Sequence, residues 1–420
     1  MLWRNSQLFR ASLFLLTVIQ IQPVLADLSI TQAEQSALTN DSVLKALAAQ
    51  VSAMRDLAIA EDTLPDARYK LGVMNVPTDS YDLRQEPMTQ IQFGIQQMFP
   101  PGNSLELKSK IKNSQADAMH AMLTNRQRMV RRDVRIAWLD TFYWKQAEKV
   151  VQGNRKLFSD LVQVTQSQYA TGRHQQQDVM HAELELGRLD DRLLNIRSML
   201  AMSQASLTKW LGSDLNEELP DAFPALPPLS NLDQMLTMLP EHPMMQSEQA
   251  QVKASQQGVE LARQAYKPSW MLDLTYGKRE PTLLGVKRSD FASVMLMFDL
   301  PFMMAGDRQD RRVAASRYKQ QASLSERDER LRELKRMFTG TYATWQQLNQ
   351  RVKHYDDYLL PKSRENARAA MQSYQSGRGN FNSLVRARIA ELETKLQGLR
   401  VKVDHHQAQA NLLYLTGAEQ

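Results

Sequence analysis

Cysteine is absent from the 420 residues. The chain therefore has no disulfide, no thiolate metal site, no cysteine nucleophile and no lipid attached to an amino-terminal cysteine. After residue 26 the sequence also lacks an apolar run long enough to cross a membrane as a helix. If the mature chain crosses a membrane it must do so with strands, because only helices and closed barrels satisfy the backbone in lipid.

Signatures of common enzymes are missing as well. The motifs G-x-x-x-x-G-K-[ST], G-x-S-x-G and H-E-x-x-H do not occur. The net charge of +6 is small against 52 basic and 46 acidic residues, and the two signs are interleaved rather than gathered in one stripe. We therefore expect no catalytic site, no cofactor and no nucleic-acid partner.

Histidine and methionine are the remaining candidates for metal ligands, with 7 and 22 residues. The adjacent His405 and His406 would point about 100° apart on a helix and could not easily share an ion. For His181 we predict no ligand partner three or four residues away. Met244-Met245 and similar pairs fit irregular helix cores as well as soft metals. We expect the histidines to lie on solvated helix faces and predict no metal site.

Residues 1–26 have the pattern of a secretory signal peptide. Arg4 and Arg10 form a basic start, an apolar stretch runs from Leu13 to Ile21, and Ala26 precedes the expected cleavage site. The apolar stretch is about 10 residues, well short of the roughly 20 that a spanning helix needs. The sequence thus predicts export and removal of this segment.

A repeat organises the rest of the chain. Tyr169-Ala-Thr-Gly-Arg173 returns as Tyr374-Gln-Ser-Gly-Arg378, a shift of 205 residues (374 minus 169). Each copy has the order helix, two strands, very long helix, tight turn and helix. This order limits the possible folds more than composition does. We divide the mature chain into a first repeat (27–212), a proline-rich linker at the middle of the rod (213–228) and a second repeat (229–420).

Two strands are predicted in each repeat, at about 67–76, 88–99, 270–279 and 290–301. Apolar residues alternate with polar or small ones, and aromatic residues lie near the strand ends, as in lipid-facing barrel strands. A small soluble sheet packed on a helix is the alternative. Four strands are too few to close a barrel, so the barrel hypothesis requires an oligomer, and three chains would supply twelve strands.

The helices are long and carry sustained heptads, which are typical of coiled-coil packing. Ser29 to about Leu64 is predicted as one helix that Pro65 closes. Ser104 to Tyr169 would reach roughly 100 Å at about 1.5 Å per residue. The shorter helices are about half that length, so two of them can lie end to end beside a long one. Pro361 lies inside a helical stretch and should kink it.

The repeated turns have glycine where a left-handed residue can end one helix before the next begins. A plain helical hairpin explains the glycines but not the Tyr and Arg that flank them in both copies. Exposed tips on a long rod could dock another helical hairpin. The predicted tip residues are Tyr169, Thr171, Gly172, Arg173, Tyr374, Ser376, Gly377 and Arg378.

Taken together, the signal peptide, the repeated unit and the Tyr-x-x-Gly-Arg turns resemble the TolC family of outer-membrane efflux channels, from residue 27 to about 417. The resemblance implies a mainly helical fold with a small β part. In that family a homotrimer forms a twelve-stranded barrel in the outer membrane of a Gram-negative bacterium, which continues into a periplasmic coiled-coil tunnel. The tunnel tip meets a periplasmic adaptor, or membrane fusion protein, which links it to an inner-membrane pump.

The family pattern also places an acidic stretch just after each tip turn, at the tunnel entrance. The first copy has Asp178-Val-Met-His181-Ala, whereas the second has Ser383-Leu-Val-Arg386-Ala. An acidic ring at this gate is therefore in doubt, because relatives draw the entrance chiefly from the second copy. The resemblance implies Asp178, His181, Ser383 and Arg386 as gate residues.

The function implied is that of a passive exit duct of a tripartite efflux pump, with outer-membrane lipid around the strands and no enzymatic activity. In length the chain looks closer to those channels of the family that are paired with metal-exporting pumps of the resistance-nodulation-division class. Two alternatives remain open: the outer-membrane channel of a type I protein secretion system, and a soluble periplasmic coiled-coil adaptor or scaffold.

Overall fold

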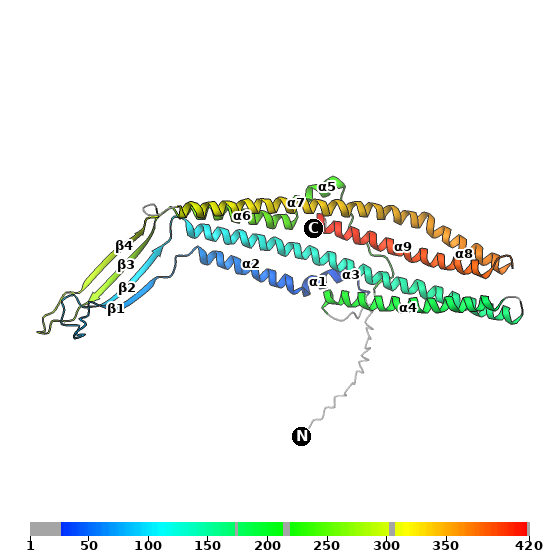
Figure 1. The fold of residues 1–420 in the computed structure, drawn as a ribbon, viewed down its shortest axis with the longest axis horizontal. Coiled ribbons are helices and arrows are strands. Elements are labelled where there is room, and N and C mark those ends of the chain that lie inside the picture. The colour runs from blue at the N-terminus through cyan, green and yellow to red at the C-terminus, as the bar shows by residue number, and fades with distance from the viewer. Residues whose placement is uncertain (1–26, 173–174, 213–218, 302–306, 418–420) are drawn as a thin grey trace, which may run out of the picture.

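The computed structural model describes residues 27–172, 175–212, 219–301 and 307–417. The chain forms a long rod with a small sheet at one end and two helical hairpins at the other (Figure 1). The predicted signal peptide lies outside the described residues. Among the described helices, none combines the length and the apolar character needed to cross a membrane.

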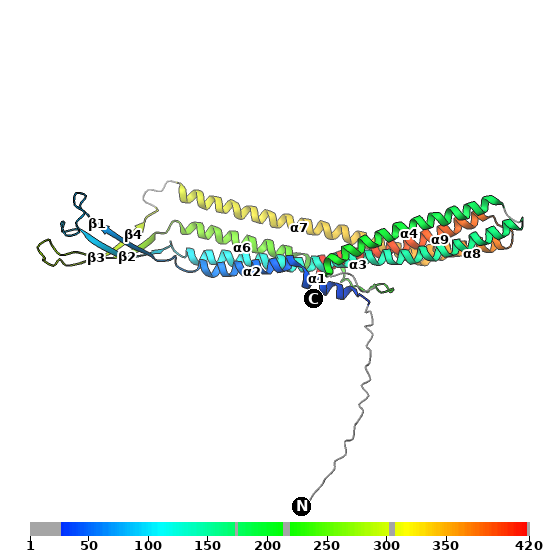
Figure 2. The same ribbon diagram turned by 90° about the horizontal axis from the view of Figure 1, so that it is seen from below.

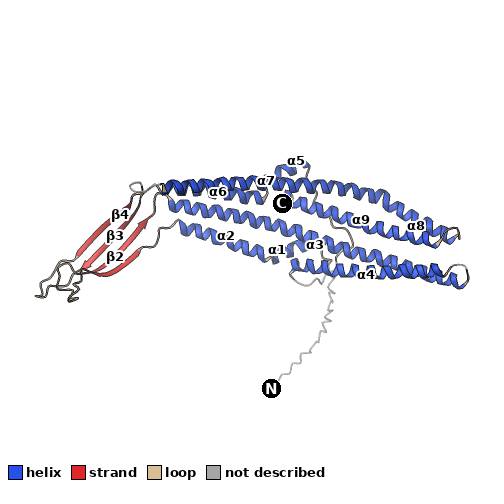
Figure 3. Ribbon diagram, viewed as in Figure 1, coloured by secondary structure: helices blue, strands red, loops and turns tan. Residues whose placement is uncertain are grey.

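The fold is mainly helical with one small sheet, as the sequence predicts (Figure 3). The order helix, strand, strand, long helix, turn, helix occurs twice along the chain; its origin by duplication stays a prediction. The elements are α1 (Ile30–Asn40), α2 (Ser42–Glu61), β1 (Arg68–Met74), β2 (Gln90–Phe99), α3 (Ser104–Ala170), α4 (Gln176–Leu211), α5 (Leu232–Met238), the 3-10 turn η1 (Leu239–Glu241), α6 (Pro243–Gln264), β3 (Ser269–Lys278), β4 (Phe291–Asp299), α7 (Arg308–His354), the π-helical segment η2 (Tyr355–Leu359), α8 (Leu360–Gln375) and α9 (Phe381–Thr416).

The sheet is antiparallel throughout, in the order β1-β2-β3-β4. One cross-strand row consists of Tyr69, Ile95, Leu274 and Val294, and it lies on an apolar face. Tyr69 is 83% and Val294 72% exposed, so none of the described residues covers this face. The opposite face is polar around Asp273, which accepts hydrogen bonds from Lys70 and Gln96. Within the described residues, β1 and β4 each have one edge without a partner strand.

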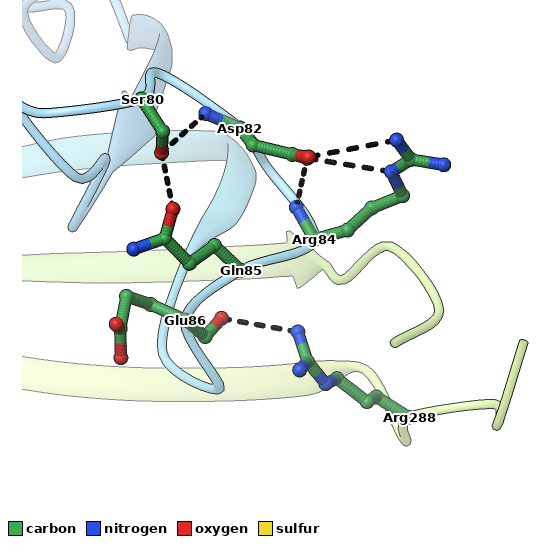
Figure 4. A network of polar contacts seen from close by, with 6 residues as sticks. All are labelled: Ser80, Asp82, Arg84, Gln85, Glu86 and Arg288. Carbon is green, nitrogen blue, oxygen red and sulfur yellow. Dashed lines mark hydrogen bonds and ion pairs between the residues drawn. The ribbon is translucent and has the colours of Figure 1, made fainter. Parts of the chain in front are cut away.

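The loops that join the strands are tied to each other at the far end of the rod (Figure 4). Arg288 Nη1 donates to the carbonyl of Glu86 at 3.0 Å, and Arg279 Nη1 donates to that of Pro87 at 3.1 Å. Within the first loop, Asp82 accepts a hydrogen bond of 2.9 Å from the backbone N–H of Arg84. These bonds hold the loop 75–89 against the loop 279–290.

The helices form one curved layer (Figures 1 and 2). In the half next to the sheet, α2, α3, α6 and α7 lie side by side in that order. In the half next to the tips, the order is α4, α3, α9 and α8. The long α3 therefore runs beside α2 and then α4, while α7 and α8 run beside α6 and then α9, as the relative helix lengths suggest.

The prediction of one helix from Ser29 to about Leu64 is wrong, because the chain breaks at Asp41. Asp41 leaves the helical conformation at φ −64° and ψ 110°, and its side chain accepts a hydrogen bond of 2.7 Å from the N–H of Leu44. Arg126 on α3 binds the same carboxylate at 2.6 Å. Burial opposes ionisation of Asp41, but these hydrogen bonds outweigh it and lower its pKa. A capping side chain thus competes successfully with helix continuation.

The segment before Pro361 widens into the π-helical turn Tyr355–Leu359. Proline has no N–H and its ring clashes with the preceding turn, so a regular α-helical hydrogen bond cannot form there. Figure 1 shows the α7–α8 edge of the rod bending toward the tips beyond this point. The bend has the local cause that the sequence predicts.

Candidate functional site: the helical tips

Each tip is a helical hairpin closed by a left-handed glycine. Gly172 and Gly377 both have φ +72°, and a Cβ at either position would meet no atom within 4 Å. The N–H of Gly172 donates to the carbonyl of Tyr169 at 2.9 Å, and that of Gly377 donates to the carbonyl of Tyr374 at 3.0 Å. Glycine is therefore favoured by backbone conformation, not by lack of space.

Further backbone hydrogen bonds close the second turn. The N–H of Arg378 donates to the carbonyl of Ser373 at 3.0 Å, which completes a Schellman motif with the Gly377 bond. Asn380 then begins α9 by accepting a hydrogen bond of 2.8 Å from the N–H of Ser383. Thr171, Ser376 and Arg378 are exposed on these turns, whereas Arg173 lies outside the described residues.

The two tyrosines of the repeated motif are not equivalent. Tyr169 is 48% exposed, whereas Tyr374 is 6% exposed. The hydroxyl of Tyr374 donates to Gln168 Oε1 at 3.0 Å, and its ring packs edge-on against Phe381 with centroids 5.8 Å apart. Burial raises the pKa of Tyr374. Only Tyr169 offers its ring to a partner, while Tyr374 joins the α8–α9 hairpin to α3.

The four predicted gate residues lie on the first turns of α4 and α9. Asp178 and His181 are half-buried, and the His181 ring faces Phe381 edge-on at 6.2 Å. Ser383 and Arg386 are exposed. Within the described part of the chain, no hydrogen bond or ion pair links this second pair to Asp178 or His181. One protomer brings two polar pairs to the tips without joining them.

The prediction for His181 is wrong on one point. Glu185 lies one turn along α4, and its Oε1 is 3.7 Å from His181 Nε2, so a residue with ligand chemistry does lie four residues away. Glu185 is 6% exposed and also pairs with Arg188. Two groups do not make a metal site, and no cluster of three or more His, Cys, Asp or Glu side chains suited to a metal occurs among the described residues.

Two buried carboxylates near the tips were not predicted from the sequence. Glu185 and Glu391 are each 6% exposed. Glu391 pairs with Arg388 at 3.1 Å and with Lys395 at 2.7 Å, three residues before it and four after it. Opposite charges at these spacings next to an apolar stripe were the available signal.

The expectation of solvated faces is also wrong for His405 and His406. The His405 ring stacks on Trp345 with centroids 5.5 Å apart, and His406 lies 4.5 Å from the ring of Phe223. Desolvation lowers the pKa of both imidazoles. They lie half-buried at the middle of the rod, where α9 packs against its neighbours.

Comparison with known proteins agrees with this geometry. Residues 237–418 match the sequence profile of the family described as outer membrane efflux protein. The second repeat thus carries the sequence profile of that family, over 182 of the 420 residues (418 minus 237, plus 1). The resemblance to TolC-type channels is thereby confirmed. None of the curated proteins compared with the chain matches it.

Solved structures of outer-membrane channels share the fold along nearly the whole chain. The outer-membrane channel OprN is 15% identical with a TM-score of 0.77, covering 93% of this chain and 90% of that chain. CusC is 15% identical with a TM-score of 0.77 and coverages of 93% and 92%. VceC from Vibrio cholerae is 14% identical with a TM-score of 0.76 and coverages of 92% and 96%. At this identity the likeness concerns the fold, and it does not single out one branch of the family.

Proposed function

We propose that three copies of this chain form an outer-membrane exit channel that conducts substrates passively from a periplasmic adaptor and an inner-membrane pump to the exterior. The observation that carries the proposal is the four-stranded sheet at the end of the rod. Its apolar face is uncovered and both of its edges are open. Four strands cannot close on themselves, whereas twelve can form a barrel with lipid outside.

The sheet suits lipid better than water. Exposed Leu71, Phe93, Leu296 and Phe298 lie on the apolar face with Tyr69 and Val294, which is a larger apolar surface than a soluble monomer usually leaves uncovered. Phe99 stacks on Trp270 with centroids 3.8 Å apart where the strands meet the helices. Aromatic side chains at that height would form the membrane-interface girdle. We therefore propose an outer-membrane location with the helical rod in the periplasm, after cleavage behind Ala26.

The tips would serve as the adaptor-binding end and the gate. The exposed turns around Gly172 and Gly377 present short helical hairpins to a partner hairpin. Separation of the two hairpins of one protomer would break the Tyr374–Gln168 hydrogen bond and uncover Phe381, so adaptor contacts would bias a two-state packing equilibrium. Asp178, His181, Ser383 and Arg386 would line the entrance.

Electron microscopy of the protein extracted in detergent from isolated membranes tests the proposal. We expect the protein in the outer-membrane fraction, with an amino terminus at Asp27, as threefold tubular particles about 100 Å or more long, the length of a helix such as α3. Soluble monomers or dimers would overturn the channel proposal. Co-purification with a resistance-nodulation-division pump would support efflux, whereas co-purification with an ABC exporter would support protein secretion instead.

A further inference from the structure

The helical layer has two unlike edges. In the half next to the sheet, α2 forms one edge and α7 the other, with α3 and α6 between them (Figures 1 and 2). The sheet repeats this arrangement, with β1 at one edge and β4 at the other. Unlike edges on opposite sides of a chain can pair only head to tail between copies. Such a seam requires the outer faces of α7 and α2 to complement each other.

The first three turns of α7 present a basic face. Arg308, Arg311, Arg312 and Lys319 are exposed and lie within about 120° of the helix circumference, together with Tyr318, which is 78% exposed. Cations near a helix amino terminus oppose the helix dipole, so helix stability does not explain them. In the described part of the chain, no carboxylate pairs with Arg308, Arg312 or Lys319.

The acidic groups of this segment do not neutralise the face. Asp310 points to another side of α7, where it accepts a hydrogen bond from the hydroxyl of Tyr266. Asp307 lies 3.5 Å from Arg311, but both side chains are more than 75% exposed, at 76% and 81%. A pair that exposed contributes little. The basic face therefore remains available to a partner.

The outer face of α2 differs from the basic face of α7 in the size and the charge of its side chains. Leu44, Val51 and Ala58 recur every seven residues and are buried against α3. The opposite side of α2 is exposed and carries small residues that permit close approach of another helix, namely Ala46, Ala49, Ala53 and Ala60. Asp56 and Lys45 border this face, Asp56 nearer the sheet and Lys45 nearer the middle of the rod. Asp62 follows Leu44 by 18 residues, or five turns, and so lies on the side of α2 that faces α3.

The charges on the two faces occur at matching heights. The end of α2 and the start of α7 both adjoin the sheet (Figure 1). A rotation about the long axis leaves heights unchanged, so positions within one copy can be compared directly. Asp56 and Lys45 are 11 residues apart (56 minus 45) and Arg312 and Glu326 are 14 apart (326 minus 312), which is about 17 and 21 Å of helix.

We propose that the basic face of α7 packs on the alanine-rich face of α2 in a second copy of this chain, and that charge sets the register. Asp56 meets the arginines at Arg308–Arg312, and Lys45 meets Glu326. The seam rests on the proposed channel assembly, and it names the surface through which each copy selects its neighbour. Opposite charges at both heights favour this register, whereas a shifted register brings Lys45 toward the basic residues.

Cysteine cross-linking tests contact at the seam without background, because the chain has no native cysteine. Ala49→Cys with Ala322→Cys places one thiol on each face at the same proposed height. We expect a disulfide between copies in native membranes under mild oxidation. The matched control, Ala49→Cys with Gln321→Cys, turns the second thiol by about 100° and should give at least about fivefold less product. Equal cross-linking of the two pairs would overturn the proposed faces.

Charge reversal tests the register. Arg308→Glu with Arg312→Glu, or Asp56→Arg, should each lower the assembled fraction at least about fivefold at fixed concentration, because attraction at this height becomes repulsion in every seam. The three-substitution variant should recover to within about twofold of the parent. The reversals at Arg308 and Arg312 suit the dipole at the start of α7, so unfolding of that helix does not explain a loss.

The possible results separate the seam from the channel. Threefold tubular particles that lack the Ala49–Ala322 cross-link, or that tolerate both one-sided reversals, overturn the seam and leave the channel proposal standing. One-sided losses that the three-substitution variant does not rescue overturn the assigned register. A parent protein that is monomeric in outer-membrane extracts overturns both proposals.

Discussion

Tyr374 joins the two hairpins through one hydrogen bond that can be removed with little change in packing. Tyr374→Phe keeps the ring against Phe381 and deletes the donor to Gln168, whose amide can turn to solvent. One such bond contributes about 1 kcal/mol, so backbone amides of α8 near the tip should exchange hydrogen about fivefold faster. Hydrogen-exchange mass spectrometry measures this rate.

Tyr169→Phe is the matched control, because Tyr169 is 48% exposed and makes no side-chain hydrogen bond within the described residues. Its exchange should equal that of the parent protein. Equal acceleration in both variants would mean that the Tyr374–Gln168 bond does not hold the hairpins together.

A second prediction concerns the need for glycine at the two tip turns. Gly172→Pro together with Gly377→Pro should abolish export while membrane insertion survives, because proline is confined to φ near −65° whereas both residues have φ +72°. Gly153→Ala is the control, since it lies inside α3 with nothing within 4 Å of a new Cβ. The control should retain export and gain up to about 1 kcal/mol of helix stability. In cells that lack a native channel, resistance to exported compounds measures export, and membrane fractionation measures insertion. Normal export by the double variant would show that the tips are not part of the mechanism.

Sequence could identify the turns but not the difference between them. Glycine after a helical pattern followed by another helix predicts a left-handed cap from local conformation alone, and both glycines adopt it. Whether a tyrosine before that cap is buried depends on what packs against it, in this case Phe381 from the next helix and Gln168 from α3. Those neighbours lie seven and 206 residues away, so local pattern carries no signal for them.

Among the helices, the bend before Pro361 gives a further prediction. Pro361→Ala restores an N–H donor, and the π-helical turn Tyr355–Leu359 should revert to regular α-helix. We expect a higher melting temperature and weaker export, because a straighter α8 displaces its tip from α9. Lys362→Ala, at an exposed position beside the proline, should change neither property. Unchanged export by Pro361→Ala would show that curvature of this edge is dispensable.

The helix boundaries show where a local sequence pattern is enough to predict the structure and where it is not. The span of α3 was predictable because nothing between Ser104 and Ala170 competes with its hydrogen bonds. At Asp41 a competing cap existed in the sequence, but its strength also depends on Arg126, 85 residues away on another helix. The half-burial of His405 likewise depends on stacking with Trp345 from α7. In both cases tertiary contacts decided what local pattern left open.

For the whole rod, the histidines at its middle predict a dependence of stability on pH. Burial, with a further contribution from nearby Arg128, lowers the pKa of His242 to about 4. Folded His242 is therefore neutral at pH values where the unfolded chain would bind a proton. Stability should be highest above about pH 6.5, fall as the pH drops toward about 4 and lose nothing further from this group below that, with a total loss of about 3 kcal/mol.

His242→Asn provides the control for that pH dependence. The His242 Nδ1 accepts a hydrogen bond of 3.2 Å from the N–H of Met244 at the start of α6, and asparagine can make the same cap. Thermal unfolding at pH 7.5 and pH 4.5 should show a smaller difference for the variant than for the parent. An unchanged difference would assign the pH dependence to other groups, such as His405 and His406, whose pKa values burial also lowers.

At the level of the whole chain, the repeated element order allowed the mainly helical fold with a small sheet to be predicted. Four alternating strands and two long helices in that order restrict the possible arrangements more than any single motif. The faces of α2 and α7 that point away from the layer could not be recognised from spacing alone. Their significance depends on knowing that α3 and α6 occupy the positions between them.

The pairing of β2 with β3 has a consequence for how the chain folds. Phe99 faces Trp270 across the sheet, so this pairing joins residues 171 apart in the sequence (270 minus 99). The α3–α4 hairpin, by contrast, needs only neighbouring residues. High contact order slows strand pairing, because loop-closure entropy is lost before the contacts form. The helical tips should therefore form early. The apolar strands β1 and β2 should stay without β3 and β4 until the second half of the chain has been synthesised. During that interval the exposed strands are most prone to aggregation.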